Sequence, residues 1–452
     1  MHIPGRGTMM ADSHRPARLI PRARAHIPRP AARLLRTKAG LAIAALGCSA
    51  LAACGSAGAS TGPVTLNFYL YQDTSVATST AVSNCNAQSD GAYKISYQYL
   101  PQAADGQRQQ LVRRLAAHDG SIDIMGLDVT WEAEFAQAGW ILPWTGSNKA
   151  SVVNGTLGPA LQTAEYKGQL YAAPDNSNTQ LLWYRSDLVK TPPTTWAEMI
   201  ADAEQLAKEG KPHYIEIQGA QYEGATVWFN TMVASAGGSI LNADGSQVTL
   251  GTPAVQALSV MKQLATSPAA DPSLDVQEEN QNRLAMEAGT AAFELNYPFV
   301  YPAMKADNPK LFKDFKWTLY PEVVPGQPAK VTIGGIDLAV GKYSQHPALA
   351  FKAALCLRDA QNQLIGATVG GVPPTITSLY HNPKLYPDYP MHADILQALQ
   401  NASVRPKSAV YQVVSIDISH LISPPKGINP TGTVSSMKSQ LADALQSKGL
   451  VP

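Results

Sequence analysis

The sequence has only four cysteines, and none of them forms a C-x-x-C pair, which argues against a zinc ribbon or a thioredoxin-type redox site. It also lacks the H-E-x-x-H motif of metalloproteases and both glycine-rich phosphate-binding motifs, G-x-G-x-x-G and G-x-x-x-x-G-K-[ST]. One G-x-S-x-G match, at 58–62, lies in a Gly/Ser/Ala segment without the strand and helix that a nucleophile elbow requires. The histidines after residue 38 are scattered without metal-ligand spacing. We therefore expect no catalysis, no metal and no cofactor.

Positive charge is concentrated at the start of the chain. The first 38 residues hold eight arginines and one lysine against a single acid, Asp12, and small apolar residues follow from 39 to 53. That run is shorter than the roughly 18 apolar residues of a spanning helix, and it is typical of an export signal, with Met9 or Met10 as alternative starts. Because the whole chain carries +1 and this segment +8, the remainder carries −7. It has no basic face for nucleic acid, so we expect no nucleic-acid partner.

A cysteine ends the apolar run. Cys54 follows Leu-Ala-Ala, which closely resembles a bacterial lipobox. We expect 1–53 to be a signal peptide with lipobox, Cys54 to carry lipid, and 54–62 to be a flexible Gly/Ser-rich tether. A diacylglyceryl group with further acylation would anchor the protein stably to a membrane. The alternative is a secretory signal cleaved nearby, with Cys48 and Cys54 both incidental.

Two cysteines remain in the rest of the chain, Cys85 and Cys356, each within a helix-like segment. An even pair in an oxidising compartment is expected to form a disulfide. Two buried free thiols are the alternative. The sequence alone does not place the two segments side by side.

Strand-like and helix-like segments alternate along the nearly 400 remaining residues, a length that favours two domains. This order predicts an α/β fold with a mostly parallel sheet and helices on its faces. Thr195 and Glu198 have the spacing of a helix N-terminal capping box. The expected strands are 64–71, 122–128 and 214–220, the expected helices 106–120, 130–140, 194–210, 225–237, 252–267 and 279–289, and further extended segments 168–189 and 329–340.

Polar side chains follow the ends of several of these strands. In open α/β sheets, ligands bind beyond the carboxyl ends of the strands. Carboxylates and amides there suit sugar hydroxyls, and aromatic rings suit sugar C–H faces. Any one of these residues could instead cap a helix or stabilise a turn. The residues concerned are Gln72, Asp73, Asp128, Asn176, Asn178 and Glu223.

At these residues the sequence resembles the extracytoplasmic sugar-binding proteins of ABC importers, in the group that includes maltose- and trehalose-binding proteins. It resembles the LpqY-like trehalose-binding lipoproteins of actinobacteria most closely, in order along nearly the whole mature chain. The segments that carry the likeness are LVRRLAAHDGSIDIMGLDVTWEAEFAQAGW, GQLYAAPDNSNTQLLWYRSDLV, GAQYEGATVWFN, ASAGGSI, PGQPAKVTIGG, YPMHADI and VRPKSAVYQ.

This resemblance implies a two-lobed periplasmic-binding-protein-like fold of type II, like maltose-binding protein, with a hinge between the lobes. Lobe 1 would comprise 63–176 plus 329–376, and lobe 2 would comprise 177–328 plus 377–452. The protein would be a monomer on the outer face of the cytoplasmic membrane. It would capture a disaccharide, with trehalose favoured, and deliver it to ABC permease subunits driven by a cytoplasmic ATPase.

The resemblance also assigns ligand-binding residues where the motifs match. Asp128 falls at the family's hydroxyl-accepting aspartate, and Asn178 lies in the segment beside the hinge. Glu223 is the glutamate of the YEG motif. Gly335 lies in the IGG loop, and Arg405 is the arginine of VRP, where its planar fork suits a positioned donor.

Other assignments match less closely. Gln72 and Asp73 occupy the first-strand loop of the family. Glu294 and Tyr297 belong to FELNYPF, where LpqY-like chains have tryptophan in place of Tyr297. A tyrosine can still stack on a pyranose ring, but its smaller face leaves maltose, malto-oligosaccharides and trehalose analogues as alternative ligands.

Two other classes of protein stay open. A secreted carbohydrate-active enzyme would need two carboxylates facing each other across a cleft, and Glu132/Glu134 and Glu278/Glu279 are acid pairs in the sequence. A surface lipoprotein that binds a protein partner would instead expose an apolar patch.

Overall fold

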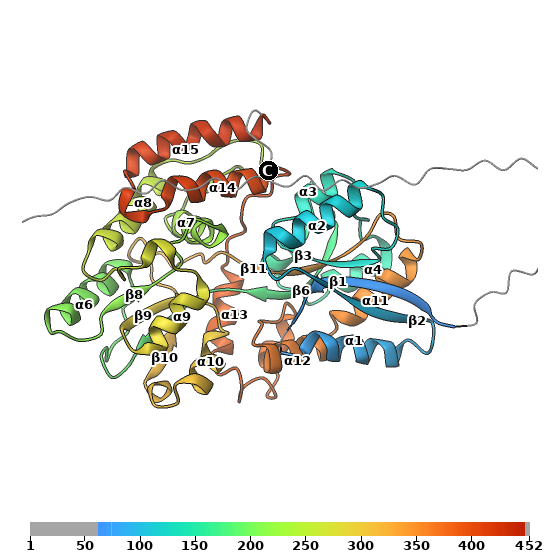
Figure 1. The fold of residues 1–452 in the computed structure, drawn as a ribbon, viewed down its shortest axis with the longest axis horizontal. Helices are drawn as coiled ribbons and strands as arrows, with labels where there is room; N and C mark the ends of the chain where they lie inside the picture. The colour runs from blue at the N-terminus through green and yellow to red at the C-terminus, as the bar shows by residue number, and fades with distance from the viewer. Residues whose placement is uncertain (1–61, 74, 448–452) are drawn as a thin grey trace, which may run out of the picture. The chain divides into compact units, whose positions relative to one another are not determined.

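The structure is a computed structural model that describes residues 62–73 and 75–447. The expected signal peptide, Cys54 and nearly all of the expected tether lie outside these residues. Residues 61–452 form a compact unit by themselves. Its described part contains two large β-sheets covered by helices, and a small hairpin of β4 (Glu165–Tyr166) and β5 (Gln169–Leu170) (Figure 1).

The first sheet has the strand order β2-β1-β3-β11-β6. Strands β1, β2 and β3 are parallel, whereas β11 runs antiparallel to both β3 and β6. One hydrophobic core joins this sheet to the helices on its faces. The strands are β1 (Val64–Tyr71), β2 (Tyr93–Leu100), β3 (Ile124–Asp128), β6 (Ala172–Asn178) and β11 (Gly334–Val340), and the helices are α1 (Ala77–Gln88), α2 (Ala104–Ala116), α3 (Glu132–Gln137), α4 (Gly146–Val153) and α11 (Pro347–Leu357).

The second sheet has the order β10-β7-β9-β8, and only its β8–β9 pair is parallel. A second core packs five helices against it. The strands are β7 (Leu181–Arg185), β8 (Tyr214–Glu216), β9 (Ala291–Asn296) and β10 (Phe315–Thr318), and the helices are α6 (Trp196–Lys208), α7 (Glu223–Ser235), α8 (Thr252–Thr266), α14 (Tyr411–Ile422) and α15 (Pro430–Leu445).

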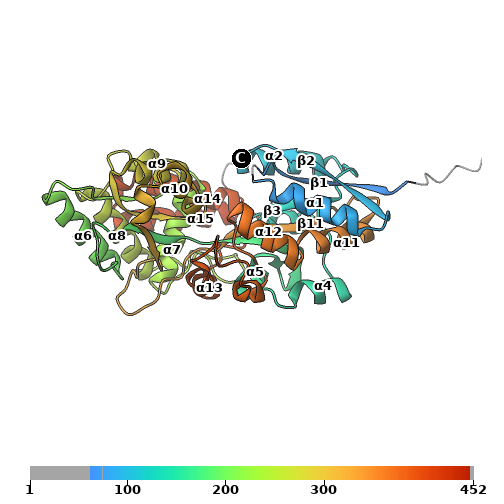
Figure 2. The same cartoon turned by 90° about the horizontal axis from the view of Figure 1, so that it is seen from below.

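A third core lies between the sheets and combines apolar side chains from β7 and β10 with others from five further helices. Figure 2 shows α5, α12 and α13 gathered there. The helices are α5 (Gly158–Thr163), α9 (Glu279–Ala288), α10 (Val300–Asp307), α12 (Ala360–Gly370) and α13 (His392–Gln400), and four 3-10 turns are η1 (Leu274–Val276), η2 (Leu311–Lys313), η3 (Thr377–His381) and η4 (Pro425–Gly427).

The expectation of a mostly parallel sheet holds for β1, β2, β3 and β6 of the first sheet, which run in one direction, but it fails for β11 and for the second sheet. The chain leaves the first sheet at Asn178, enters the second at Leu181, and returns as β11 at Gly334. The strands β7 and β11 therefore run against their neighbours, because each enters its sheet directly from the other one rather than through a helical crossover. We propose that the two lobes divide at these crossovers.

The capping box expected at the start of α6 is confirmed. The Thr195 side chain accepts a hydrogen bond from the Glu198 backbone N–H at 3.1 Å, and the Glu198 carboxylate accepts one from the Thr195 N–H at 3.1 Å. Such reciprocal bonds satisfy two donors that a helix start would otherwise leave free.

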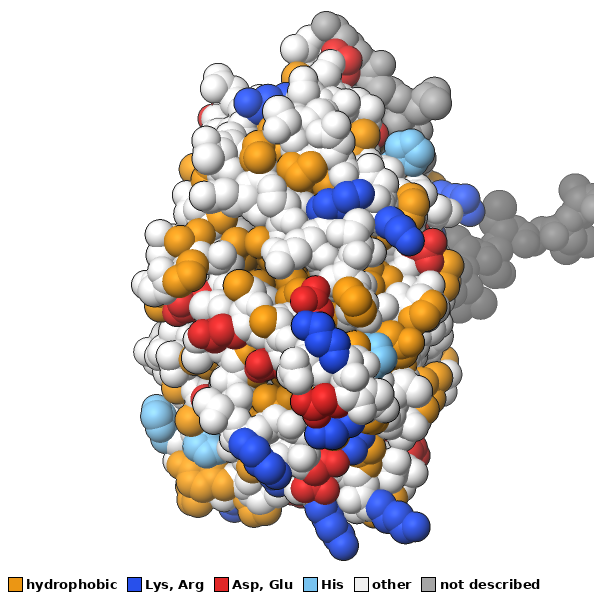
Figure 3. All heavy atoms as spheres, turned by 90° about the vertical axis from the view of Figure 1, so that its left-hand side faces the viewer, with side chains coloured by type: hydrophobic (Ala, Val, Ile, Leu, Met, Phe, Trp, Pro, Cys, Tyr) orange, Lys and Arg blue, Asp and Glu red, His pale blue; other side chains and the backbone are white. Residues whose placement is uncertain are grey.

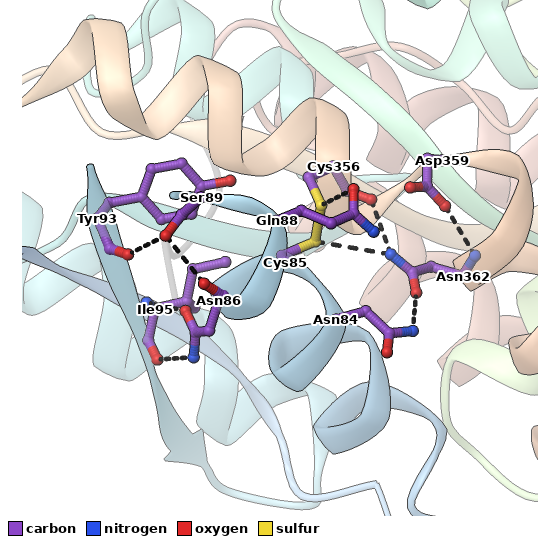
Figure 4. Close-up of a disulfide and its surroundings, with 10 residues drawn as sticks. All are labelled: Asn84, Cys85, Asn86, Gln88, Ser89, Tyr93, Ile95, Cys356, Asp359 and Asn362. Atoms are coloured by element: carbon purple, nitrogen blue, oxygen red, sulfur yellow. Dashed lines mark hydrogen bonds between the residues drawn. A yellow bond between two sulfur atoms is a disulfide. The ribbon is translucent and has the colours of Figure 1, made fainter. Parts of the chain in front are cut away.

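A disulfide joins Cys85 of α1 to Cys356 of α11, with Cα atoms 5.8 Å apart (Figure 4). Asn362, on α12, donates a hydrogen bond to the Cys85 sulfur at 3.6 Å and accepts one from the Asn84 side chain at 2.9 Å. The bridge therefore ties together segments that are 271 residues apart in sequence and belong to one lobe.

Two features of the described part of the chain are the distribution of its surface charge and the length of its apolar helices. On the face shown in Figure 3, acidic and basic side chains are interspersed rather than gathered by sign. Among the described helices, none is both long and apolar enough to cross a membrane.

Candidate functional site

The site begins at one edge of the first sheet. Strands β1, β3 and β6 all point the same way, so their carboxyl ends meet at this edge together with the amino end of β11. Asp128 ends β3 and Asn178 ends β6. This is the edge at which open α/β sheets bind ligands.

Arg405 connects this edge to the second lobe. Its Nη1 donates to the Glu223 Oε1 at 2.6 Å, and its Nη2 lies 3.7 Å from the Asp128 Oδ1. Glu223 is the first residue of α7, where the helix dipole favours a negative charge. The structure thus brings together three residues that the sequence assigned to a ligand site, Asp128, Glu223 and Arg405.

The second lobe holds Arg405 in place. Glu223 also accepts hydrogen bonds from the hydroxyls of Tyr411, at 2.5 Å, and Ser415, so both of its carboxylate oxygens have partners in the second lobe. The Arg405 side chain is only 5% exposed. A buried guanidinium with fixed partners is preorganised to donate in one direction, here toward Asp128.

Charge pairing keeps the Arg405 guanidinium ionised. Burial alone would lower the pKa of Arg405, but the nearby Asp128, Tyr411 and Glu223 raise it above its ordinary value. Burial, followed by the Glu223 charge, raises the pKa of Tyr411, which stays a neutral hydroxyl. The site therefore offers a charged guanidinium donor next to a neutral hydroxyl.

Asp128 and Arg405 are close enough for one hydroxyl beside them to bridge both groups. At 3.7 Å the two groups attract but do not form a direct hydrogen bond. The Asp128 Oδ1 also accepts from the Thr130 N–H and hydroxyl, at 3.0 and 2.8 Å, and no hydrogen bond or ion pair among the described residues uses its Oδ2. A sugar hydroxyl can donate to Asp128 and accept from Arg405 at once.

Asn178 lies beside the same cluster. Its backbone pairs with Gly334 across β6 and β11. A Cβ on Gly334 would lie 3.5 Å from the Asn178 Cβ and 3.9 Å from the Arg405 Nη2. Because glycine has no side chain, no atom of Gly334 lies between Asn178 and the Arg405 guanidinium at this position.

Tyr297 approaches the cluster from the second sheet, one residue beyond the end of β9. Burial raises the pKa of its hydroxyl, and the charges of Glu279, Arg405 and Glu223 also act on it. Tyr222 and Glu279 are neighbours on the same side, and each perturbs the other's pKa. Tyr222, Glu279 and Tyr297 therefore form a group of aromatic and carboxyl side chains in the second lobe.

The first-strand loop has a different role in this structure. The Asp73 carboxylate accepts from the Ser75 N–H and hydroxyl, at 2.7 and 2.6 Å, and from the Thr78 N–H at 2.8 Å. Although burial acts the other way, these bonds lower the pKa of Asp73. The side chain of Gln72 is exposed. Asp73 thus stabilises the start of α1, and neither residue joins the Arg405 cluster.

Two other assigned residues serve the backbone and the core. A Cβ on Gly335 would lie 2.2 Å from the Asn176 carbonyl oxygen, so glycine is needed there for the close approach of β11 and β6. Glu294 is completely buried, and its Oε1 accepts from the Asn296 side chain at 2.7 Å. Asn296 in turn accepts from the Tyr297 N–H at 2.8 Å, so Glu294 supports the backbone at Tyr297 from within the core.

Sequence reasoning missed Tyr411 and Ser415, the hydroxyls that hold Glu223. The two residues are four apart on α14, so they share one helix face. Polar residues at that spacing in an apolar helix were the available signal. Their role is visible only in the folded structure, where Glu223, 188 and 192 residues earlier in the sequence, packs against them.

In residues 62–73 and 75–447, no group of three or more His, Cys, Asp or Glu side chains is arranged to hold a metal ion. The cluster instead combines one guanidinium, two carboxylates, an amide and phenol groups. Such a set binds polar hydroxylated molecules through many directed hydrogen bonds.

The fold and the site define a two-lobed α/β binding protein. The chain belongs to the family of bacterial extracellular solute-binding proteins, whose sequence model matches residues 88–363. A probable ABC transporter-binding protein of Deinococcus radiodurans is 28% identical over 318 residues, which cover 68% of this chain and 75% of that protein.

Solved structures confirm the predicted fold class. The maltose-bound MalE3 of T. maritima has a TM-score of 0.74 and 24% identity, covering 84% of this chain and 99% of its own. The GacH receptor of Streptomyces glaucescens, solved unliganded and with acarbose, has a TM-score of 0.72 and 21% identity, covering 86% of this chain and 100% of its own. At these identities the likeness establishes the two-lobed fold.

Proposed function

We propose that this protein is the lipid-anchored solute-binding component of an ABC sugar importer, and that it captures a disaccharide, trehalose, between its two lobes. It delivers the sugar to permease subunits driven by a cytoplasmic ATPase, and it catalyses no reaction. It acts outside the cytoplasm as a monomer.

One observation carries this proposal. Arg405 is fixed to Glu223 of the second lobe and faces Asp128 of the first at 3.7 Å. A hydroxyl held between them would contact both lobes, so binding would favour the closed arrangement. A ligand with many hydroxyls, such as a disaccharide, could make this contact while Asn178 and Tyr297 hold its other groups.

The comparisons support a sugar as the solute. The relative from Deinococcus is named as an ABC transporter-binding protein, and the solved structures of similar fold hold maltose or acarbose. The preference for trehalose rests on the resemblance of the site segments to LpqY-like proteins. Maltose, malto-oligosaccharides and trehalose analogues are the ligands against which it must be tested.

Replacing Asp128 or Asn178 by alanine is expected to weaken trehalose binding by about tenfold or more without unfolding the protein. A hydrogen bond contributes about 1.5–3 kcal/mol when it involves a charged group such as Asp128 and about 0.5–1.5 kcal/mol when it involves a neutral amide such as Asn178, which can form more than one. Both side chains lie at strand ends. Fluorescence titration with circular dichroism on the same samples measures affinity and folding together. Arg108→Ala is the matched control, because Arg108 pairs with Glu134 at 2.6 Å on the first lobe and lies outside the cluster. Binding like the wild type in both variants would refute the site.

The lipid anchor has its own test. Cys54→Ala removes the thiol to which lipid would be attached, so the protein is expected to move from the membrane fraction to the soluble fraction. Cys48→Ala is the control and should leave the distribution unchanged. If Cys54→Ala stays with membranes, the lipobox assignment fails while the sugar site is unaffected.

A further inference from the structure

A pair of carboxyl groups is buried directly behind the turn that carries Asp128. Glu132 begins α3 and Asp337 lies in β11, and each is only 1% exposed. Among the described residues, no other residue donates a hydrogen bond to either Glu132 oxygen or to the Asp337 Oδ1. Burial raises the pKa of Glu132, and so does a side-chain hydrogen bond that the two carboxyl groups form with each other. Two ionised carboxylates accept hydrogen bonds but cannot donate, so this contact requires a proton on one of them.

The pair closes a ring around the Asp128 turn. Asp337 lies opposite Leu127 in the β3–β11 ladder, next to the Asp128–Ile336 pair. The turn then runs from Asp128 to Glu132, with the Trp131 N–H donating to the Asp128 carbonyl at 2.9 Å. The acid pair therefore fixes the end of the turn to the strand beside its beginning.

We propose that Glu132 and Asp337 share a proton and thereby position Asp128 for the ligand. The inference rests on the proposed function, since it assigns Asp128 to ligand binding. Glu132 and Asp337 are positioning residues, because both are buried and act on the ligand only through the turn. Loss of the proton would place two repelling carboxylates under this turn and displace it.

Neighbouring groups favour retention of the proton. Burial, the Asp337 carboxyl and the Asp128 charge raise the pKa of Glu132 well above its ordinary value, and burial raises the pKa of Asp337 to about 7. The other groups that face the pair are the Thr163 hydroxyl of α5, which donates to Asp337 at 3.0 Å, the Asp175 carboxyl of β6, and Arg358, which follows α11. Arg358 alone is cationic.

The test compares Glu132→Gln with Glu132→Ala in the chain from Thr61 onward, which is a compact unit by itself. Glutamine can donate to Asp337 but cannot ionise, whereas alanine removes the link. Glu134→Ala is the matched control, because Glu134 is on the same helix but pairs outward with Arg108 at 2.6 Å. Trehalose affinity is measured from pH 6 to pH 10, together with hydrogen exchange of the peptide that spans residues 124–135.

We expect Glu132→Ala to weaken trehalose binding tenfold or more and to speed exchange in this peptide, while Glu132→Gln and Glu134→Ala stay within threefold of the wild type at pH 7. Wild-type affinity should fall as the pH rises, and that of Glu132→Gln should fall less. If Glu132→Ala does not fold, the comparison of Glu132→Gln with the wild type across pH decides the matter.

Two results would overturn the proposal. The first is a Glu132→Ala variant with the affinity and the exchange rates of the wild type. The second is a Glu132→Gln variant that binds as weakly as Glu132→Ala, or whose affinity depends on pH as strongly as that of the wild type. Hydrogen exchange needs no ligand. If the wild type binds no trehalose, the proposed function fails, but the exchange data still decide whether the pair holds the turn.

Discussion

We expect Arg405→Ala to raise the dissociation constant for the sugar at least a hundredfold, which corresponds to about 2.7 kcal/mol of binding free energy. The substitution removes the buried donor that faces Asp128 and leaves the partly exposed Glu223 carboxylate without its cationic partner. Truncating one member of a buried charge pair typically costs 2–5 kcal/mol in binding. Isothermal titration calorimetry with trehalose measures the loss directly.

Two control variants separate the fork geometry from the charge. Arg405→Lys keeps a positive charge but cannot reach Glu223 and Asp128 together, so an intermediate loss of about tenfold is expected. Arg108→Ala breaks the ion pair with Glu134 on the first lobe and should bind like the wild type. An Arg405→Ala variant that binds within threefold of the wild type would contradict the proposed site.

The second large effect concerns stability. Replacing both Cys85 and Cys356 by alanine is expected to lower the free energy of unfolding by about 2–4 kcal/mol, because the bridge links segments 271 residues apart and restricts the unfolded chain. Denaturant titration without reductant measures this change. Trehalose affinity of the folded double variant should remain near that of the wild type, since the bridge joins α1 to α11 away from Arg405.

The matched control is the wild type in the presence of a reductant. Reduction should reproduce most of the loss seen in the double variant and should not alter that variant further. Equal stability of the double variant and the oxidised wild type would show that the disulfide does not contribute to stability.

Local pattern predicted many helices and strands, because apolar spacing and capping residues act over a few neighbours. The α6 capping box at Thr195 and Glu198 is one such case. Strand β2 was missed although its sequence YKISYQYL alternates apolar and polar residues, the local pattern of a strand. The direction of β11 could not be predicted, because it depends on where the chain recrosses from the second sheet.

The resemblance placed Asp128, Glu223 and Arg405 in one site, and the structure brings them together. It could not distinguish ligand groups from their supports. Asp73 has the strand-end position of a binding residue, yet it stabilises the start of α1. Glu294 is near Tyr297 in sequence, but it lies in β9, where every residue is buried. Such distinctions depend on contacts between distant segments.

The central claim is that the Arg405 cluster binds a disaccharide between the lobes. Calorimetric titration of the chain from Thr61 onward, with trehalose, maltose, sucrose and glucose in parallel, tests it most directly. We predict saturable binding of trehalose at micromolar or tighter affinity, with weaker or no binding of the others. A folded protein that binds none of the four sugars would contradict the claim.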